Sequence, residues 1–239
     1  MSSKKLKIIH TEASHGWGGQ EIRILTEANW FQKKGHSILF ILPKESTLYQ
    51  RVSTIFPTYI LAFTPKSQLL DLWRIFRIFQ QERPDVVATH SSVDSWVGLL
   101  GAKLAGVPTK VRYRHVSTPV ANHTFNRFQY HNLCDCIITT GDCVRTPLIN
   151  HFSLQSQKVH TIPTGLEPPS ELPRRSVART ALIQELGLPE TSRFIGQVSV
   201  LRSWKGHTYL IQSWEKIAPR FPDHHLVLVG GGLVLQYPS

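Results

Sequence analysis

The feature that most constrains the fold is a regular alternation of short apolar runs with segments of helical length. The apolar runs lie at residues 6–10, 37–42, 58–61, 85–90, 109–115, 135–140 and 158–162. This alternation is typical of βαβ units, in which helices join parallel strands. The sequence therefore predicts an α/β fold with a mainly parallel sheet and helices on both faces. Ligands of such folds collect at the carboxyl ends of the strands.

A segment rich in proline divides the chain. Residues 163–175 read PTGLEPPSELPRR and show no periodicity, which is typical of a linker between domains. We expect a first domain over 1–163, a linker over 164–175 and a second, incomplete domain over 176–239. In this second unit, helices are predicted at 177–186 and 207–219, and strands in RFIGQVSVL and HHLVLVG.

Composition and charge exclude several classes of protein. No apolar run reaches the roughly 18 residues that a membrane-spanning helix needs, and the N-terminus does not resemble a signal peptide, so we expect a cytoplasmic protein. The formal net charge is +11, and residues 1–163 carry nine of these charges, with 19 Lys and Arg against 10 Asp and Glu. An excess of this kind favours an anionic partner, either a phosphorylated substrate or an anionic lipid surface. Since the chain has no zinc finger, no RNA-recognition signature and no basic run, no nucleic-acid partner is predicted.

The three cysteines do not indicate a disulfide framework. Cys134, Cys136 and Cys143, together with His131, have residue types that bind metals. Cys136, however, lies in the apolar run CIITT, where a small buried thiol is common. The prediction is therefore that the chain holds no metal, and no cofactor is predicted.

The turn HGWGGQE follows the first predicted strand and precedes a helical pattern. Gly16, Gly18 and Gly19 permit positive φ and let a ligand approach the backbone, while the helix start offers unpaired N–H groups and a positive dipole end. These properties suit a phosphate or a sugar. The spacing matches neither G-x-G-x-x-G nor a P-loop. A tight turn without a ligand is the alternative interpretation.

Residues 69–84, LLDLWRIFRIFQQERP, form an amphipathic helical pattern. Asp71, Arg74 and Arg77 follow one another at intervals of three, which predicts one narrow polar stripe. We expect this stripe to face solvent while the helix packs on the sheet. The alternative is a basic amphipathic helix that docks the protein on an anionic membrane.

In the second unit, the stretch GQVSVLRSWKGHTYLIQSW places Arg202 and Lys205 between a predicted strand and a predicted helix. Two cations beside a helix N-terminus can hold a diphosphate. They stabilise a diphosphate leaving group most, because its charge grows as the bond to carbon breaks. A solvated surface pair is the alternative.

Four motifs together resemble the retaining glycosyltransferases of family 4, which have the GT-B fold of two Rossmann-like domains. The motifs are GGQE after the first strand, DVVATHSS at the fourth, IPTG before the linker, and GQVSVLRSWKG followed by LVLVGGG. Their order and spacing extend over nearly the whole chain. The resemblance implies transfer of a sugar, with retention, from a nucleotide-sugar donor to a lipid-linked or polysaccharide acceptor in cell-surface glycan biosynthesis.

The resemblance also implies roles for particular residues. Gly18 and Gly19 would let the donor sugar and its phosphate approach, and Arg202 and Lys205 would bind the donor diphosphate. His115 lies where related enzymes place a histidine beside the reacting sugar, and we expect it to be catalytic, although HV replaces the commoner HD here.

His90 and Ser91 are expected on the acceptor side, although Ser91 or Ser92 could equally cap the next helix. The scheme requires no metal, because Arg202 and Lys205 would supply the positive charge.

The chain departs from the family pattern after LVLVGGG. The family's second domain continues and carries an E-x7-E motif, which this sequence lacks. An alternative function is therefore a truncated, non-catalytic remnant that binds an acceptor or a membrane, as a peripheral protein at the inner face of the cell membrane. A nucleotide-sugar epimerase on the same fold is a third hypothesis.

Overall fold

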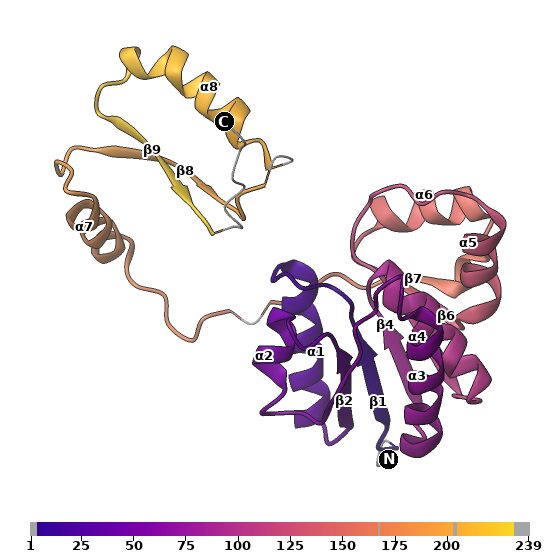
Figure 1. Ribbon diagram of the computed structural model, residues 1–239. Coiled ribbons are helices and arrows are strands. Elements are labelled where there is room, and N and C mark those ends of the chain that lie inside the picture. Colours follow the sequence, from indigo (N-terminus) through magenta and orange to yellow (C-terminus); the bar gives the residue numbers. More distant parts are fainter. Residues whose placement is uncertain (1–3, 167, 203–204, 232–239) are drawn as a thin grey trace. The chain divides into compact units, whose positions relative to one another are not determined.

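The computed structural model describes residues 4–166, 168–202 and 205–231, and it divides the chain into two compact units, residues 1–166 and 167–239 (Figure 1). The division falls inside the segment expected to be a linker, where residues 168–174 are exposed and form neither helix nor strand. Each unit is described by itself. No helix in the described part of the chain is both long and apolar enough to cross a membrane.

The first unit is built on a parallel sheet of seven strands in the order β3-β2-β1-β4-β5-β6-β7. The strands are β1 (Lys7–Thr11), β2 (Ser37–Leu42), β3 (Thr58–Ile60), β4 (Val86–Thr89), β5 (Thr109–Arg114), β6 (Cys136–Thr139) and β7 (Val159–Thr161). Each corresponds to one of the predicted apolar runs, and each pair of neighbouring strands is parallel. The predicted α/β class with a parallel sheet is therefore confirmed.

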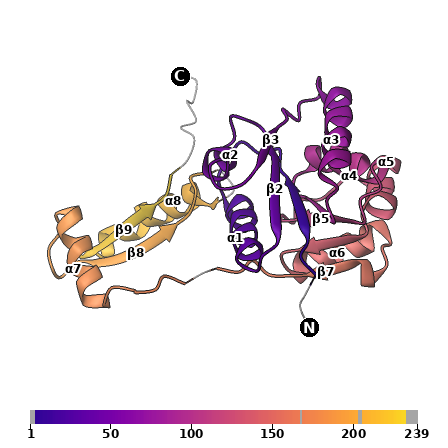
Figure 2. The ribbon, with the colours of Figure 1, turned by 90° about the horizontal axis from the view of Figure 1, so that it is seen from below.

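The connecting helices lie on both faces of the sheet, as Figure 2 shows for α1 and α2 against α3 and α4. They are α1 (Gly19–Lys33), α2 (Thr47–Val52), α3 (Gln68–Glu82), α4 (Ser92–Leu104), α5 (Thr124–Phe128), the π-helical turn η1 (Gln129–Leu133), α6 (Asp142–Phe152) and the short 3-10 turn η2 (Ser156–Lys158). Alternate residues of β1 separate the two layers: Ile8 packs with α1 and α2, and Ile9 packs with α3 and α4. This alternation follows from the two-residue period of a strand.

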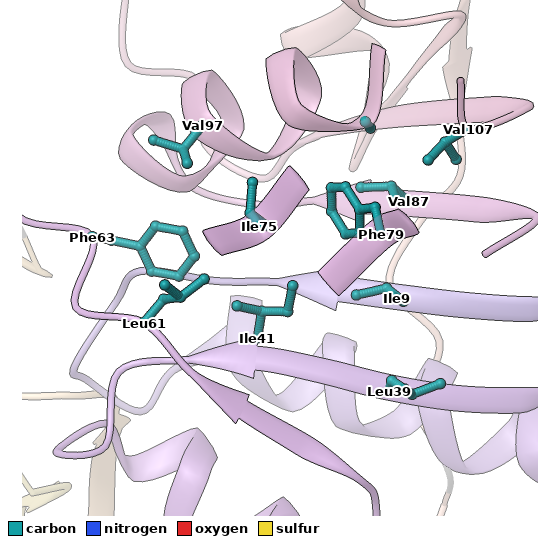
Figure 3. Close-up of a cluster of buried hydrophobic side chains, with 11 residues drawn as sticks. Ile9, Leu39, Ile41, Leu61, Phe63, Ile75, Phe79, Val87, Val97 and Val107 are labelled. Carbon is teal, nitrogen blue, oxygen red and sulfur yellow. The ribbon is translucent and has the colours of Figure 1, made fainter. Parts of the chain in front are cut away.

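The core on the α3 and α4 side joins strands β1, β2 and β4 to the two helices. In Figure 3, Phe79 of α3 lies beside Val87 of the sheet, and Ile75 of α3 lies between Phe79 and Val97 of α4. The two helices approach closely at Gly101, where a Cβ atom would lie 2.5 Å from a methyl group of Ile75. Glycine is therefore required at this position for packing rather than for a special backbone angle.

The second unit contains two parallel strands, β8 (Arg193–Val198) and β9 (His224–Val229), with helices α7 (Arg175–Leu186) and α8 (His207–Ile217) and the 3-10 turn η4 (Ala218–Arg220). These elements match the predicted start of a βαβ arrangement. Ile183 of α7 is buried, whereas Val198 and Val229 at the ends of the strands are largely exposed.

Candidate active site

The candidate site lies at the carboxyl ends of the central strands of the first unit. The strand order reverses its direction between β1 and β4, and in open α/β sheets the point of reversal is where ligands bind. His10 lies in β1, His90 directly follows β4, and His115 directly follows β5. Two of the predicted residues, His90 and His115, are thus brought together with a third histidine that sequence reasoning did not select.

The three histidines form a continuous row that we call the histidine row. Nδ1 of His10 lies 3.0 Å from Nε2 of His90, and Nδ1 of His90 lies 3.0 Å from Nε2 of His115. The rings are stacked, with centroids 5.3 Å apart in both pairs and interplanar angles of 19° and 25°. Phe40 stacks on His10, and Tyr113 packs against both His90 and His115. The hydrogen bonds and stacking together fix the orientation of each ring.

Burial keeps the histidine row neutral. His10 and His90 are 1% and 2% exposed, and His115 is half-buried. Desolvation lowers the pKa of His10 to about 4 and holds the pKa of His90 well below its usual value. Desolvation, followed by the nearby charges of Arg23, Arg112 and Arg114, lowers the pKa of His115 to about 3. At pH 7 each ring is therefore an uncharged imidazole with one N–H.

Two buried guanidinium groups surround the histidine row. Arg112, 1% exposed, donates from Nη1 to the carbonyl oxygens of His90 at 2.8 Å and Tyr113 at 2.6 Å. Arg23 of α1 pairs with Glu27 at 2.7 Å and lies over the Tyr113 ring, 5.3 Å from its centroid. These contacts hold the end of β5 and the segment after β4 in place and give the site a positive potential.

Arg23 also ties α1 to the far edge of the sheet. Its Nη1 donates to the carbonyl oxygen of Ile162, just after β7, at 2.8 Å. Its Nη2 is buried and has no hydrogen-bond partner among the residues that the structure describes. An unpaired buried donor of a charged group is costly and calls for an explanation in terms of function.

Asp94 fixes the start of α4 beside the site. Its carboxylate accepts hydrogen bonds from the Thr11 hydroxyl at 2.6 Å and from the backbone N–H groups of His90 and Ser91 at 3.1 and 2.8 Å. Ser91 is the N-cap of α4 and forms a capping box with Asp94. The structural role that the sequence allowed for Ser91 is therefore present. Its side chain is only half-buried and remains close to His90 along the chain.

The segment between β1 and α1 contains a buried carboxyl group, Glu12. This side chain accepts from the Ser14 N–H at 2.7 Å and from the amide of Gln20. Burial, and then the charge of Asp94, raise the pKa of Glu12 to about 8. Glu12 is therefore largely protonated at pH 7 and adds little negative charge to the site.

The glycines of this turn keep ordinary backbone angles, so the positive φ that glycine permits is not used here. Gly18 is extended, with φ of −161°, and the positive-φ glycines in the described part of the chain lie elsewhere. A Cβ atom on Gly19 would meet no atom within 4 Å, and one on Gly18 would meet only a Glu21 oxygen at 3.6 Å. The interior of the protein thus does not require glycine at either position. The two glycines leave the backbone at the start of α1 open to approach from outside.

Arg202 and Lys205 lie on the connection between β8 and α8, as predicted. Both are exposed, and the N–H of Lys205 donates to the carbonyl oxygen of Arg202 at 3.0 Å. The α8 helix begins directly after Gly206, whose φ of +77° requires glycine. Ser203 and Trp204, which belong to the same motif, and residues 232–239, which include the end of LVLVGGG, lie outside the described residues.

The prediction of a solvent-facing polar stripe on α3 is wrong for Asp71. Asp71 is 1% exposed and accepts from the Phe63 N–H at 3.0 Å and the Ser67 hydroxyl at 2.6 Å, so it binds the preceding loop rather than solvent. Arg74 and Arg77 are exposed, beside the exposed Trp73. The exposed side of α3 is therefore apolar and basic, without the expected acid.

The described residues do not contain a cluster of three or more His, Cys, Asp or Glu side chains that could hold a metal ion. Cys134 is buried and donates to the carbonyl oxygens of Gln129 and Tyr130, Cys136 is half-buried, and Cys143 is exposed. Nε2 of His131 instead lies 2.9 Å from the carbonyl oxygen of Phe152.

Sequence reasoning missed His10, Arg23 and Arg112 as parts of the site. His10 sits in the apolar run KIIHT and Arg112 in the strand TKVRYR, and a polar residue in a buried strand is the signal that could have identified both. Arg23 lies in a helix, where an arginine is ordinarily a surface residue. Its burial depends on Tyr113 and Ile162, which are distant in the sequence.

Comparison with known proteins finds relatives in sequence and in fold. A curated relative, an uncharacterized glycosyltransferase of Haemophilus influenzae, is 24% identical over 223 residues, which cover 90% of this chain. Among solved structures, a glycosyltransferase from Rickettsia africae superposes with a TM-score of 0.78 at 20% identity over 95% of this chain. Anabaena HepE, solved in complex with UDP and glucose, superposes with a TM-score of 0.73 at 18% identity, also over 95%. These superpositions show the fold, which is that of GT-B glycosyltransferases.

The chain spans about 60% of the length of these proteins: 59% of the Haemophilus protein, 60% of the Rickettsia protein and 62% of HepE. The family model for Glycosyltransferase Family 4 matches residues 17–168, which is more than half of the chain and includes Gly18 and Gly19, the row residues His90 and His115, and the last strands of the first unit. The chain therefore belongs to glycosyltransferase family 4.

Proposed function

We propose that this protein takes part in transferring a sugar, with retention of configuration, from a nucleotide-sugar donor to a lipid-linked or polysaccharide acceptor. The observation that carries the proposal is the family match over residues 17–168, which contains Gly18 and Gly19 and the row residues His90 and His115. HepE, of the same fold, was solved with UDP and glucose, which supports a nucleotide-sugar as the donor class. The cellular role would be the assembly of cell-surface glycans on the cytoplasmic side of the membrane.

Donor binding is proposed separately for the glycine turn of the first unit and, at its diphosphate, for Arg202 and Lys205 of the second unit. The open backbone at Gly18 and Gly19 suits a sugar or phosphate that approaches the positive end of α1. Arg202 and Lys205 would bind the diphosphate and stabilise the charge that grows on it as the sugar leaves. In this scheme the protein contributes positioning and electrostatic stabilisation.

His115 is the proposed catalytic residue, because it is the half-buried member of the histidine row. As a neutral imidazole it would hydrogen bond to the reacting sugar without adding positive charge beside the oxocarbenium-like centre. Ser91 lies beside the row and would line the acceptor side. His90 is 2% exposed, so we propose that it acts on the acceptor side through its contact with His115.

An anionic membrane surface is the proposed docking partner of α3. Leu69, Leu70 and Trp73 are 85%, 49% and 58% exposed, and Arg74 and Arg77 lie beside them. Because Asp71 is buried, no acid opposes lipid head groups on this side of the helix. Arg77 lies over the Trp73 ring, 5.6 Å from its centroid, so the cation and the exposed apolar side chain lie side by side. Docking here would bring a lipid-linked acceptor to the carboxyl edge of the sheet, where α3 begins.

The experiment that tests the function measures binding of UDP-glucose and other nucleotide-sugars to the full chain by calorimetry, followed by product analysis with and without lipid-linked acceptors. Lys205→Ala is expected to weaken donor binding sharply. Lys216→Ala, in the last turn of α8, is the matched control and should bind as the wild type does. Unchanged affinity in Lys205→Ala would contradict the assignment.

The product analysis separates the alternatives. Sugar transfer to an acceptor supports the transferase. Binding to acceptor or lipid without turnover would support the non-catalytic remnant. Conversion of the donor to its epimer in the absence of acceptor would support the epimerase.

A further inference from the structure

The histidine row can carry its two hydrogen bonds in only two ways. Each neutral imidazole has one N–H, so the protons must all point from His10 toward His115 or all point from His115 toward His10. In the first arrangement, Nδ1 of His10 and Nδ1 of His90 donate, and the proton of His115 is on its Nδ1. In the second, Nε2 of all three rings carries the proton.

The buried end of the histidine row distinguishes the two arrangements. Nε2 of His10 is buried and has no hydrogen-bond partner among residues 4–166, 168–202 and 205–231. The second arrangement would place an N–H on this atom, and orphaned buried N–H groups are rarer than buried acceptors that lack a donor. The first arrangement leaves only a lone pair unpaired there. The direction from His10 to His115 is therefore favoured.

The packing around the row holds this arrangement in place. His10 stacks on Phe40, whose ring centroid is 5.6 Å away, and is 1% exposed, so it cannot turn toward water. The carbonyl oxygen of His90 accepts from Arg112 at 2.8 Å, and the carbonyl oxygen of His115 accepts from the Thr140 hydroxyl at 3.2 Å. Protonation of the row is opposed by burial and by Arg23 and Arg112, which lower the pKa of both His90 and His115.

From this geometry we infer that His10 and His90 are positioning residues that fix His115 as the Nδ1–H tautomer. His115 then accepts from His90 through Nε2 and donates from Nδ1 to an oxygen of the ligand, such as a sugar hydroxyl group. That the ligand is a nucleotide-sugar rests on the proposed function. The tautomer itself does not depend on it.

The tautomer is measured directly by long-range proton–nitrogen NMR correlation of the full chain labelled with 15N, with the His115→Gln variant identifying the signals of that ring. In the wild type, Nδ1 of His115 is expected to show the shift of a protonated nitrogen and Nε2 that of an acceptor. His115 with its proton on Nε2 would overturn the inference.

Two variants at His10 then separate the hydrogen bond from packing. His10→Phe keeps a ring on Phe40 but removes the donor, and we expect His115 to become a mixture of tautomers. His10→Asn restores a donor near the position of Nδ1 and should restore the wild-type pattern. His160→Phe, at an exposed position on edge strand β7, is the control and should leave the spectrum of His115 unchanged. A His115 tautomer that does not change in His10→Phe would contradict the inference, and the wild-type measurement remains decisive if that variant fails to fold.

Binding of UDP-glucose distinguishes this inference from the proposed function. If both hold, His10→Phe weakens UDP-glucose binding about tenfold, the effect of one well-placed hydrogen bond, and His10→Asn recovers most of it. The expected tautomer pattern without donor binding in the wild type would support the histidine row and count against the proposed donor. Donor binding with the opposite tautomer would support the proposed donor and contradict the inferred hydrogen-bond direction in the histidine row.

Discussion

The hydroxyl group of Thr11, at the end of β1, donates to the carboxylate of Asp94, in the first turn of α4, over 2.6 Å, and both side chains are fully buried. A second pair repeats this arrangement at the surface: Thr161, at the end of β7, donates to Asp142, in the first turn of α6, also over 2.6 Å. The two pairs have the same chemistry and distance and differ in burial. They therefore form a natural comparison within one chain.

We predict that Asp94→Ala lowers the free energy of unfolding by about 3 kcal/mol, the sum of a lost helix cap and unpaired buried donors. Asp142→Ala should cost about 1 kcal/mol or less, because water replaces the lost acceptor at the surface. Urea denaturation followed by circular dichroism measures both values. Equal costs for the two variants would contradict the role given to burial.

The pH dependence of stability should report on Glu12. Its pKa is raised from 4.5 in the unfolded chain to about 8 in the folded protein, so the folded protein keeps a proton that the unfolded chain releases. The stabilisation is complete below pH 4.5 and is lost as the pH rises through about 8. Glu12→Gln should remove this loss, which is on the order of a few kcal/mol for a shift of this size.

The measurement is the urea midpoint of the wild type and of Glu12→Gln at intervals between pH 5 and pH 9. Glu45→Gln makes the same substitution at an exposed loop residue, and its urea midpoints should follow the wild-type curve. If the curve of Glu12→Gln also runs parallel to that of the wild type, the raised pKa is not present in the folded protein.

Substituting Gly19 and Gly106 by alanine separates a glycine needed for ligand approach from one needed for its backbone angle. Gly19→Ala places a methyl group in open space at the start of α1, so stability should be unchanged or slightly higher because alanine favours helix. Donor binding should nevertheless fall about tenfold or more, because the methyl group occupies the path of the phosphate. Unchanged donor affinity would remove Gly19 from the site.

Gly106→Ala is the matched substitution. A Cβ atom there also meets nothing within 4 Å, but φ is +70°, so alanine should cost about 1–2 kcal/mol of stability. Donor binding by the folded fraction should be unaffected. Calorimetric titration with UDP-glucose and urea denaturation on both variants complete the comparison.

The exposed side of α3 gives a prediction for membrane binding. Replacing Arg74 and Arg77 with Glu should abolish sedimentation of the protein with vesicles that contain anionic lipid, because the cations beside Trp73 are lost. Replacing Lys33 and Lys34 at the end of α1 with Glu makes the same change in net charge elsewhere and should have little effect. Equal losses in the two double variants would indicate that net charge, rather than α3, is responsible.

Much of the fold could be predicted from the sequence because each strand is a short apolar run bounded by turn residues. The period of two also explains why Ile8 and Ile9 of β1 enter different layers. By contrast, spacing alone predicts that Asp71 lies on a solvent-facing stripe, which is wrong. Its burial depends on the backbone N–H of Phe63, which lies in the preceding loop and is not visible in helical periodicity.

The candidate site was only partly predictable for the same reason. His90 and His115 could be selected because they follow strands, and strand ends gather at one edge of a parallel sheet. His10 lies inside its strand, and its role depends on contacts across 80 residues of sequence. The hydrogen-bond direction in the histidine row requires the burial of individual nitrogen atoms, which no sequence pattern reports.

The segment between the units should be the first point of proteolysis. Residues 168–174 are exposed and belong to no helix or strand, and Arg174 and Arg175 offer adjacent tryptic sites. The two strands β8 and β9 leave Val198 and Val229 80% and 51% exposed, and a sheet of two strands is marginal by itself. We therefore expect brief trypsin treatment to leave a resistant N-terminal fragment, identified by its mass, while the second unit is degraded. Arg174→Gln combined with Arg175→Gln should delay the first cut, and equal resistance of both units in the wild type would contradict the predicted difference in stability.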